Sequence, residues 1–382
     1  MRNKTLVILL TVLFLSTAIL LTSCGKQKAK WKGTIEEKNG VTIIKNPKEP
    51  IYDDVIFSLE EELSIGEKEG REKYMFNRIA IDVDDDGYLY ILDNIAIEIR
   101  VFDKDGNYLY SIGQKGQGPG EMQRPSLPPF QITPQNEILV SDPPTRRIIF
   151  YSLKGDYLRQ ISTASIRGIF YLLKVDSKGN FIVKLLYAPV FEIKQELKMF
   201  DSELSPLVSL KTLKGDPYLP GVIRPFGPSI SFVLTQDNKI IWGTSNKYEF
   251  YILNSKAKVI KMIYKDYDLV EIPEKYKERI KERYRRAGRK VKIHFPKNFP
   301  AFSEMNIDDE GRLIVQTYER VKDKEQYYYF DVFNPIGKYI AKIPIKARRT
   351  RQYIWKKNKL YTIEEDEDGY QLVKRYKVTW KY

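Results

Sequence analysis

The feature of this sequence that most constrains its fold is a repeated unit of two apolar segments joined by a polar turn. The apolar segments are short and rich in Ile, Val, Leu, Phe and Tyr, a composition typical of strands. Each turn carries a Gly or Asn, which can supply the positive φ that a tight hairpin requires. Six copies of this unit occur, at residues 79–91, 130–140, 173–183, 232–242, 305–315 and 353–363.

The spacing of these copies predicts a β-propeller. Their turn residues are Gly87, Asn136, Gly179, Asn238, Gly311 and Asn358, which by subtraction are 49, 43, 59, 73 and 47 positions apart. The shorter spacings match the length of one propeller blade. A second hairpin follows in several copies, at residues 101–112, 150–161 and 332–343. Because two hairpins make the four strands of a blade, we expect an all-β, six-bladed propeller with four-stranded antiparallel blades.

The last blade lacks one strand, and an early segment can provide it. The sixth copy ends soon after residues 373–380, whereas Val55–Leu59 precede the first copy with no partner nearby. We expect this early segment to pair with the last blade, because ring closure removes exposed sheet edges. A two-domain all-β protein divided near residues 215–228 is the alternative, but one register shared by six copies favours a single ring.

The N-terminus has the features of a secretory signal. Arg2 and Lys4 precede an apolar run at residues 6–21 that is shorter than the roughly 20 residues needed to span a bilayer. The following Leu21-Thr-Ser-Cys24 resembles a bacterial lipobox, whose Cys is acylated, for example with palmitate, and becomes the first residue. Two or more acyl chains give stable membrane attachment. We therefore expect Cys24 to be lipidated and to anchor the protein in a bacterial cell envelope.

These features predict three segments along the chain. Residues 1–23 are a lipoprotein signal peptide, residues 24–50 a tether and leading strand, and residues 51–382 the propeller. In some bacteria an Asp directly after the lipidated Cys resembles an inner-membrane retention signal. This chain has Gly25 at that position. An outer-membrane, periplasm-facing position is therefore favoured in an organism with two membranes.

One stretch resembles a known family. Residues 102–121, continuing to Pro125, resemble NHL-type propeller repeats, and specifically the six-bladed β-propeller lipoproteins of bacterial envelopes. Residues 59–66 are also similar to that group, and the resemblance is sharp over residues 51–160. It implies a fold and a compartment, and it implies no established activity.

Composition excludes several kinds of active site. The chain has one His and one Cys, so it has no internal disulfide and no metal site that needs several imidazoles. His294 stands alone, and no Gly-x-Ser-x-Gly motif occurs. We therefore assign no catalytic residue and no cofactor from the sequence.

A glycine-rich stretch follows the second hairpin of the first copy. It contains Gly113, Gly116, Gly118, Pro119, Gly120 and Glu121. A phosphate-binding loop would have to open a helix, which Pro119 and the prolines at 125–129 prevent. We interpret the stretch as a structural crossover between blades, with Glu121 accepting backbone N–H bonds.

Four carboxylates match the ligand spacing of a calcium loop. Asp82, Asp84, Asp86 and Asp93 fit positions 1, 3, 5 and 12 of such a loop. The same residues form the repeated hairpin, and the strand-like segment after the turn leaves no room for the exiting helix. A Ca²⁺ ion is therefore a weak candidate ligand.

The long spacing before the fifth copy contains a predicted helix at about residues 273–290. Tyr276, Ile280, Tyr284 and Ala287 share one face. Lys and Arg gather toward its C-terminus, and the whole chain has a formal net charge of +14. A solvated helix that caps the propeller would satisfy this pattern. The alternative hypothesis is a partner-binding role for four arginines of this segment: Arg279, Arg283, Arg286 and Arg289.

The sequence thus favours a binding or scaffold module over an enzyme. The predicted partners are the membrane, through the N-terminal lipid, and an unidentified envelope glycan, peptide or protein. Nucleic acid is excluded as a partner because an exported lipoprotein rarely meets it, and anionic envelope components suit the basic charge better. The alternative is a calcium-dependent lactonase or hydrolase-like propeller, which needs convergent carboxylates on inner strands of different blades.

Overall fold

The computed structural model describes residues 30–52, 56–66, 72–187, 192–217, 219–324, 326–346, 352–366 and 369–381. The chain divides into two compact units, Met1–Trp31 and Lys32–Tyr382. The predicted signal peptide and Cys24 lie outside the described residues. Within the described residues, no helix is long and apolar enough to cross a membrane.

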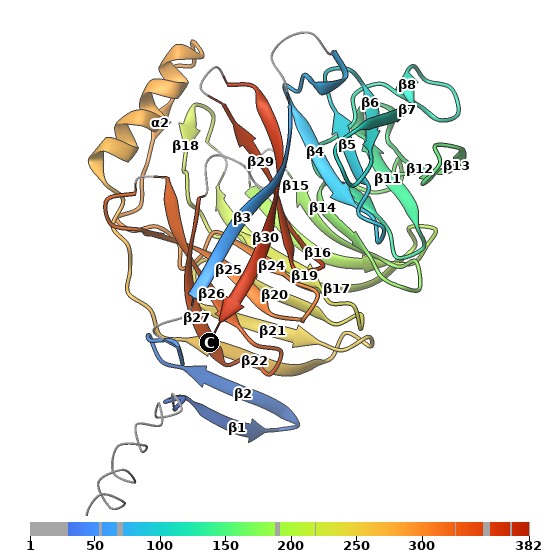
Figure 1. Ribbon diagram of the computed structural model, residues 1–382. Coiled ribbons are helices and arrows are strands. Elements are labelled where there is room, and N and C mark those ends of the chain that lie inside the picture. Colours follow the sequence, from blue (N-terminus) through green and yellow to red (C-terminus); the bar gives the residue numbers. More distant parts are fainter. Residues whose placement is uncertain are drawn as a thin grey trace, which may run out of the picture. The chain divides into compact units, whose positions relative to one another are not determined.

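The unit Lys32–Tyr382 is a six-bladed β-propeller of four-stranded antiparallel blades, as the repeat predicted (Figure 1). Blade 1 is β4 (Ile79–Val83), β5 (Leu89–Asp93), β6 (Glu98–Phe102) and β7 (Tyr108–Ile112). Blade 2 is β10 (Phe130–Ile132), β11 (Glu137–Asp142), β12 (Arg147–Ser152) and β13 (Tyr157–Ser162). Blade 3 is β14 (Ile169–Val175), β15 (Phe181–Tyr187), β16 (Glu192–Phe200) and β17 (Pro206–Pro217).

The other three blades complete the ring. Blade 4 contains β19 (Ile230–Leu234), β20 (Ile240–Thr244), β21 (Glu249–Leu253) and β22 (Val259–Lys265). Blade 5 is β24 (Glu304–Ile307), β25 (Leu313–Arg320), β26 (Tyr327–Phe333) and β27 (Tyr339–Lys346). Blade 6 is β28 (Tyr353–Lys356), β29 (Lys359–Glu365), β30 (Gln371–Lys381) and β3 (Ile56–Ile65).

The six repeated hairpins are the first two strands of the six blades. Each turn residue that the sequence singled out has a positive φ: Gly87, Asn136, Gly179, Asn238, Gly311 and Asn358. In most blades the first strand approaches the first strand of a neighbouring blade, so these hairpins lie at the centre of the ring. The turn chemistry therefore fixes the register of the inner strands.

Ring closure occurs through β3, as predicted. β3 pairs with β30 in antiparallel register, for example Ser58 with Thr379, and Figure 1 shows the two strands side by side. The closing strand reaches Ile65, beyond the predicted segment 55–59. The first and last parts of the propeller therefore complete one blade together, which leaves no open edge between them.

Part of the predicted tether is folded onto blade 4. Residues Thr34–Lys38 (β1) and Val41–Asn46 (β2) form a hairpin, and β2 pairs in parallel with β22. Asn46 fixes this pairing because its side chain donates to the carbonyls of Tyr264 and Gly337 and accepts from the N–H of Tyr339. The pairing extends blade 4 to six strands.

In three blades, the turn between the third and fourth strands packs so closely against the preceding blade that it requires glycine. A Cβ on Gly337, whose φ is +109°, would lie 2.8–2.9 Å from side-chain atoms of Ile263 and Ile44. Gly106 and Gly155 make the same approach to Ile65 and Ile112 of their preceding blades. These turns allow neighbouring blades to pack directly on one another.

The alternating strand directions give the propeller two faces. The hairpin face carries the turns between the first and second, and between the third and fourth, strands of each blade. The loop face carries the turns between second and third strands and the crossovers between blades. The loop-face connections contain the remaining elements: η1 (Glu72–Tyr74), β8 (Gln114–Lys115), β9 (Glu121–Met122), η2 (Pro143–Thr145), β18 (Val222–Ile223), α2 (Glu274–Arg286) and β23 (Lys292–Ile293).

Candidate functional site

Exposed apolar side chains occur on both faces of the propeller among the described residues, and the loop face carries part of them. Six of them belong to its turns, crossovers or adjoining strand ends: Ile95, Ile169, Tyr171, Ile193, Leu219 and Leu269. Ile95 and Leu269 are the most exposed, at 62% each. This face therefore offers apolar contacts to a partner, in addition to the charged side chains of α2.

Helix α2 lies in the crossover from blade 4 to blade 5, at residues Glu274–Arg286 (Figure 1). It lies within the predicted segment 273–290 and ends four residues before that segment does. Gly288 follows the helix with a φ of +67° and an N–H bond to the Arg285 carbonyl. The helix has no buried residue. It is therefore held to the propeller by a few contacts on one side.

Those contacts are aromatic. Tyr276 of α2 lies edge-on to Phe299, with ring centres 5.3 Å apart, and 5.8 Å from Phe226. Phe299 in turn stacks on Tyr318 of β25 at 4.5 Å and 6°. The neighbouring crossover also contributes a short parallel pairing of β18 with β23. This aromatic cluster anchors the helix and leaves its basic side chains in solvent.

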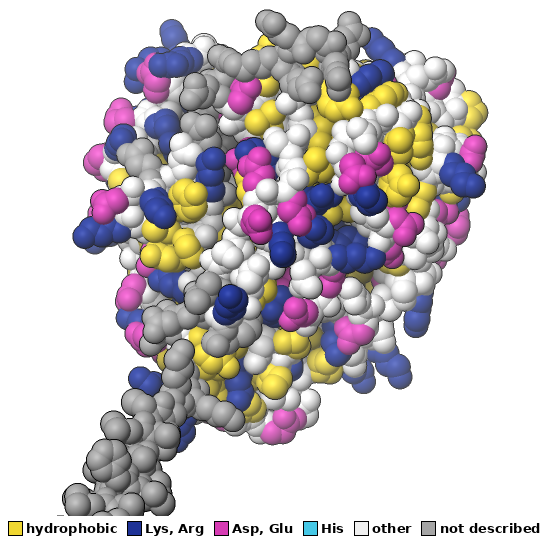
Figure 2. All heavy atoms as spheres, viewed as in Figure 1, with side chains coloured by type: hydrophobic (Ala, Val, Ile, Leu, Met, Phe, Trp, Pro, Cys, Tyr) yellow, Lys and Arg dark blue, Asp and Glu magenta, His cyan; other side chains and the backbone are white. Residues whose placement is uncertain are grey.

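The arginines of this segment fall into two groups. Arg285 and Arg286 both pair with Glu282. Among the described residues, no carboxylate forms an ion pair with Arg279, Arg283 or Arg289; Arg279 lies 4.7 Å from the ring centre of Tyr276 and Arg283 lies 6.0 Å from that of Tyr284. Figure 2 shows dark blue side chains at the upper left, over the position of α2.

The helix therefore presents uncompensated positive charge. Arg279, Arg283 and Arg286 follow one another at i, i+4 and i+7, so they form a stripe beside the anchored face. The predicted pairs Glu278–Lys281 and Glu282–Arg286 are both present, at 2.6 and 2.9 Å. The Glu282–Arg286 pair compensates the last arginine of the stripe, so the uncompensated charge of the helix is that of Arg279 and Arg283.

A buried amine lies near the centre of the loop face. Lys184 of β15 is 5% exposed, and its Nζ donates a hydrogen bond to the Ser229 Oγ at 2.8 Å. The Ser229 hydroxyl donates to the Gln195 Oε1 at 3.3 Å, and the Lys184 Nζ lies 4.7 Å from the ring centre of Tyr171. Burial lowers the pKa of Lys184 from 10.5 to about 8, and Glu304 acts in the opposite direction.

The backbone around Ser229 is fixed on both sides. Gln195 accepts from the N–H of Ile230 and donates to the carbonyl of Pro228. Ser245 accepts from the Ser229 N–H and donates its own N–H to the Ser229 carbonyl. The hydroxyl and the amine are thus held in one orientation by strands of blades 3 and 4.

The sequence did not single out Lys184 or Ser229. The available signal was a lysine within the otherwise apolar segment Phe181–Leu186. The contact itself joins residues 45 positions apart, so it could be found only from the packing of two blades.

The glycine-rich stretch lies in the crossover between blades 1 and 2. Gly113 and Gly120 have φ values of +74° and +72°, and Glu121 accepts the Gly118 N–H at 2.8 Å. A Cβ on Gly116 would lie 2.0 Å from a Glu121 carboxylate oxygen. Pro119 lies within this turn.

Blade 2 fastens this crossover. Arg147 donates to the carbonyls of Gln117 and Glu121, at 3.1 and 3.2 Å. Buried Asp142 accepts the N–H groups of Gln123 and Arg124. The polar groups of the crossover therefore bond within the protein.

Three of the four candidate calcium carboxylates, those of Asp82, Asp84 and Asp93, accept hydrogen bonds from protein N–H groups. Asp84 accepts the N–H of Asp86 and Tyr88, which makes it a turn-forming residue. Asp82 accepts the N–H of Val83 and, at 2.7 Å, that of Ile132 on blade 2, and burial raises its pKa. Asp93 bonds to N–H groups of its own turn and pairs with Arg100 at 3.2 Å.

These carboxylates do not form a metal site. Within the described part of the chain, no group of three or more His, Cys, Asp or Glu side chains is placed to hold a metal ion. The geometry therefore gives no support to the calcium candidate.

A buried ion pair joins blades 4 and 5. Asp331 of β26 is 1% exposed and lies 3.4 Å from the Lys265 Nζ at the end of β22. The hydroxyls of Tyr248 and Tyr339 donate to its two oxygens at 2.5 and 2.7 Å. Burial together with the Asp331 charge raises the pKa of both tyrosines. This cluster stabilises the blade interface and does not reach the loop-face centre.

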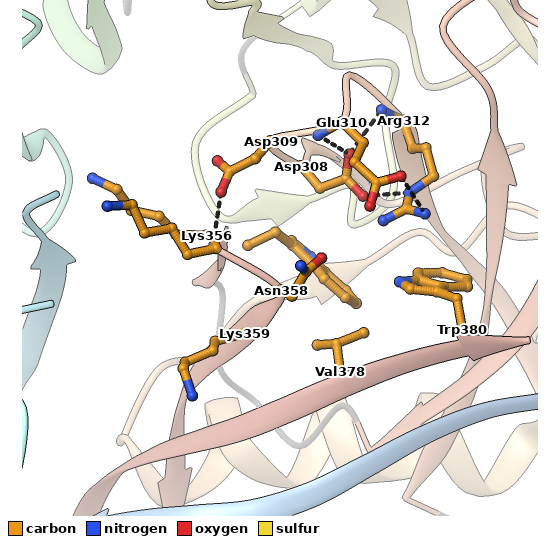
Figure 3. Close-up of a pocket in the computed structure, with 11 residues that line it drawn as sticks. Asp308, Asp309, Glu310, Arg312, Lys356, Asn358, Lys359, Val378 and Trp380 are labelled. Carbon is orange, nitrogen blue, oxygen red and sulfur yellow. Dashed lines mark hydrogen bonds and ion pairs between the residues drawn. The ribbon is translucent and has the colours of Figure 1, made fainter.

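A small cavity on the hairpin face lies between the inner turns of blades 5 and 6 (Figure 3). Figure 3 shows Arg312 beside Asp308 and Glu310, to which it pairs at 2.6 and 2.9 Å, and near Trp380. Its volume of about 20 Å³ is enough for a single water. The cavity is therefore too small to be a substrate site.

Comparisons with known proteins agree with this architecture. The family DUF5128, described as a 6-bladed beta-propeller, matches residues 71–182. No curated protein matches the sequence. A Bacteroides fragilis protein described as exported has 12% identity and a TM-score of 0.52, with 88% of this chain and 99% of that chain covered.

Two further structures are similar over most of their length. A member of the DUF4221 family from Bacteroides vulgatus has 10% identity and a TM-score of 0.49, with 85% of this chain and 98% of that chain covered. A virginiamycin B lyase from Staphylococcus aureus has 9% identity and a TM-score of 0.43, with 85% and 100% covered. At 12% identity the likeness to the Bacteroides fragilis protein is one of fold. The chain is a six-bladed β-propeller similar to DUF5128 proteins over residues 71–182.

Proposed function

We propose that this protein is a lipid-anchored binding module of the bacterial envelope, whose loop face contacts an anionic envelope partner. Cys24 supplies the anchor and α2 supplies the main electrostatic contact. The exposed apolar side chains of the same face add contacts once the partner is bound.

The observation that carries this proposal is the uncompensated charge of α2. Arg279, Arg283 and Arg289 form no ion pair with a carboxylate of the described residues, whereas Arg285 and Arg286 are paired with Glu282. The aromatic cluster around Phe299 holds the helix in place, so little ordering is required on binding. The net charge of +14 adds long-range attraction, which salt screens.

The direct test replaces Arg279, Arg283 and Arg289 together by Gln. Because these side chains are exposed and make no ion pair, we expect the unfolding temperature to change little. Binding to anionic vesicles, or to isolated anionic envelope polymers, should weaken strongly at low salt, and the difference from the wild type should shrink as salt is added. Co-sedimentation over a range of salt concentrations measures both quantities.

A matched control removes the same charge from the other side of the helix. Lys277, Lys281 and Arg285 each pair with a glutamate of α2. Replacing these three by Gln should reduce binding much less than the first variant does. Equal losses in the two variants would mean that only net charge matters, and unchanged binding in both would exclude α2 as the contact.

A further inference from the structure

Lys184 and Ser229 form a polar pair that the folding of a propeller blade does not require. Lys184 interrupts an apolar strand, and its side chain is buried without an ion pair to any carboxylate among the described residues. Burying a lone ammonium group costs stability. A residue with such a cost is a reasonable candidate for a chemical role.

The pair has the spacing of a nucleophile and a general base, and once the amine is neutral the Ser229 hydroxyl can turn from Gln195 to donate to it. The Lys184 Nζ lies 2.8 Å from the Ser229 Oγ, within the distance for direct proton transfer. Ser229 is half-buried, and Gln195 and Ser245 hold its backbone in place. The low pKa of Lys184, about 8, leaves roughly a tenth of the amine neutral at pH 7.

The surroundings indicate the kind of substrate. Tyr171, which covers the Lys184 amine, is 42% exposed, and Ile193, two residues before Gln195 on β16, is 44% exposed. Ile169, near Tyr171, is 59% exposed. Residues two apart on a strand share a face, so Ile193 lies on the same face of β16 as Gln195, which bonds to the hydroxyl. With Tyr171 beside the amine, this exposed apolar surface suits an apolar acyl group better than a charged one.

We propose that Ser229 and Lys184 act as nucleophile and general base in the hydrolysis of an apolar carboxylic ester. The Ser229 Oγ bonds to the acyl carbon as its proton passes to the Lys184 Nζ. The ester C–O bond then breaks, and the leaving alkoxide takes that proton. Water next attacks the acyl carbon and gives a proton to Lys184, after which the acyl–Ser229 bond breaks and the Ser229 oxygen takes the proton back. This activity is separate from the binding role of α2.

The test uses an alkyl fluorophosphonate probe on the full-length protein in isolated membranes. We expect covalent labelling at Ser229, identified by peptide mass spectrometry. Ser229→Ala should abolish labelling, and Lys184→Met should slow it at least 100-fold, because Met cannot accept the proton. Ser231→Ala, on the same strand, should label like the wild type.

A second measurement follows 4-nitrophenol release from 4-nitrophenyl butyrate. Release by the wild type should rise with pH through about 8, with Glu304 of β24 and Tyr171 of β14 as the ionisable groups that face the amine. Lys184→Met should lose this pH dependence while unfolding at or above the wild-type temperature. The proposal is overturned if wild-type Ser229 is not labelled, or if Lys184→Met is labelled as fast as the wild type.

Discussion

Replacing Lys184 by Met should make the protein more stable at neutral pH. The pKa of this lysine falls from 10.5 to about 8 on folding, so below pH 8 the folded state must bury a charge that the unfolded state keeps in water. That difference corresponds to about 3 kcal/mol at pH 7. The variant loses the hydrogen bond to Ser229, worth about 1 kcal/mol. The net expectation is a gain of about 2 kcal/mol.

The sign of the pH dependence makes this prediction specific. Between pH 8 and 10.5 the unfolded state binds more protons than the folded state, so wild-type stability should rise relative to the variant as pH increases. The advantage of Lys184→Met should therefore shrink above pH 8 and vanish near pH 10.5. Urea unfolding of both proteins at pH 7, 8, 9 and 10 measures the difference, with exposed Lys178→Met as a control.

A variant less stable than the wild type at pH 7 would refute this reasoning. A difference that stays constant from pH 7 to 10 would refute it too, because it would show that Lys184 keeps the same charge in both states.

Three other predictions test the fold and the anchor. Asp331→Asn leaves Lys265 buried without its counter-ion, and breaking a buried pair in this way should cost roughly 3–5 kcal/mol in urea unfolding; adding Lys265→Met to Asp331→Asn should recover part of that loss, because the amide oxygen can still accept from a tyrosine hydroxyl. Deleting residues 56–65 should lower the unfolding temperature far more than deleting residues 26–33, since only the former completes blade 6; similar temperatures for the two deletions would speak against ring closure by β3. Cys24→Ala should abolish incorporation of radiolabelled palmitate and leave the signal peptide uncleaved, so label on the variant would disprove the lipid anchor.

Local chemistry in the sequence predicts much of this fold. Positions such as Gly87 and Asn136 are visible from the sequence because a positive φ selects Gly or Asn at a hairpin turn. The alternation of apolar segments and turns then fixes the inner strands, and the unpaired segment before the first blade identifies the closing strand. The helix at Glu274–Arg286 is likewise visible from its local pattern.

Features that depend on long-range pairing are not visible in the same way. The hairpin of β1 and β2 joins β22, whose partner residues lie more than 200 positions away, through backbone bonds that no short motif encodes. The contact of Lys184 with Ser229 depends on how blades 3 and 4 pack. For the arginines of α2, the sequence shows the charges, but only the structure distinguishes Arg279 and Arg283 from the paired Arg285.

The most direct test of the proposed function is hydrogen exchange of the unit Lys32–Tyr382 with and without anionic vesicles at low salt. Our account predicts slower exchange over residues 274–293 and in the loop-face crossovers, with no change in hairpin-face turns such as residues 103–107 and 334–338. Protection confined to the hairpin face, or exchange that the vesicles leave unchanged everywhere, would contradict the assignment of the loop face as the binding surface.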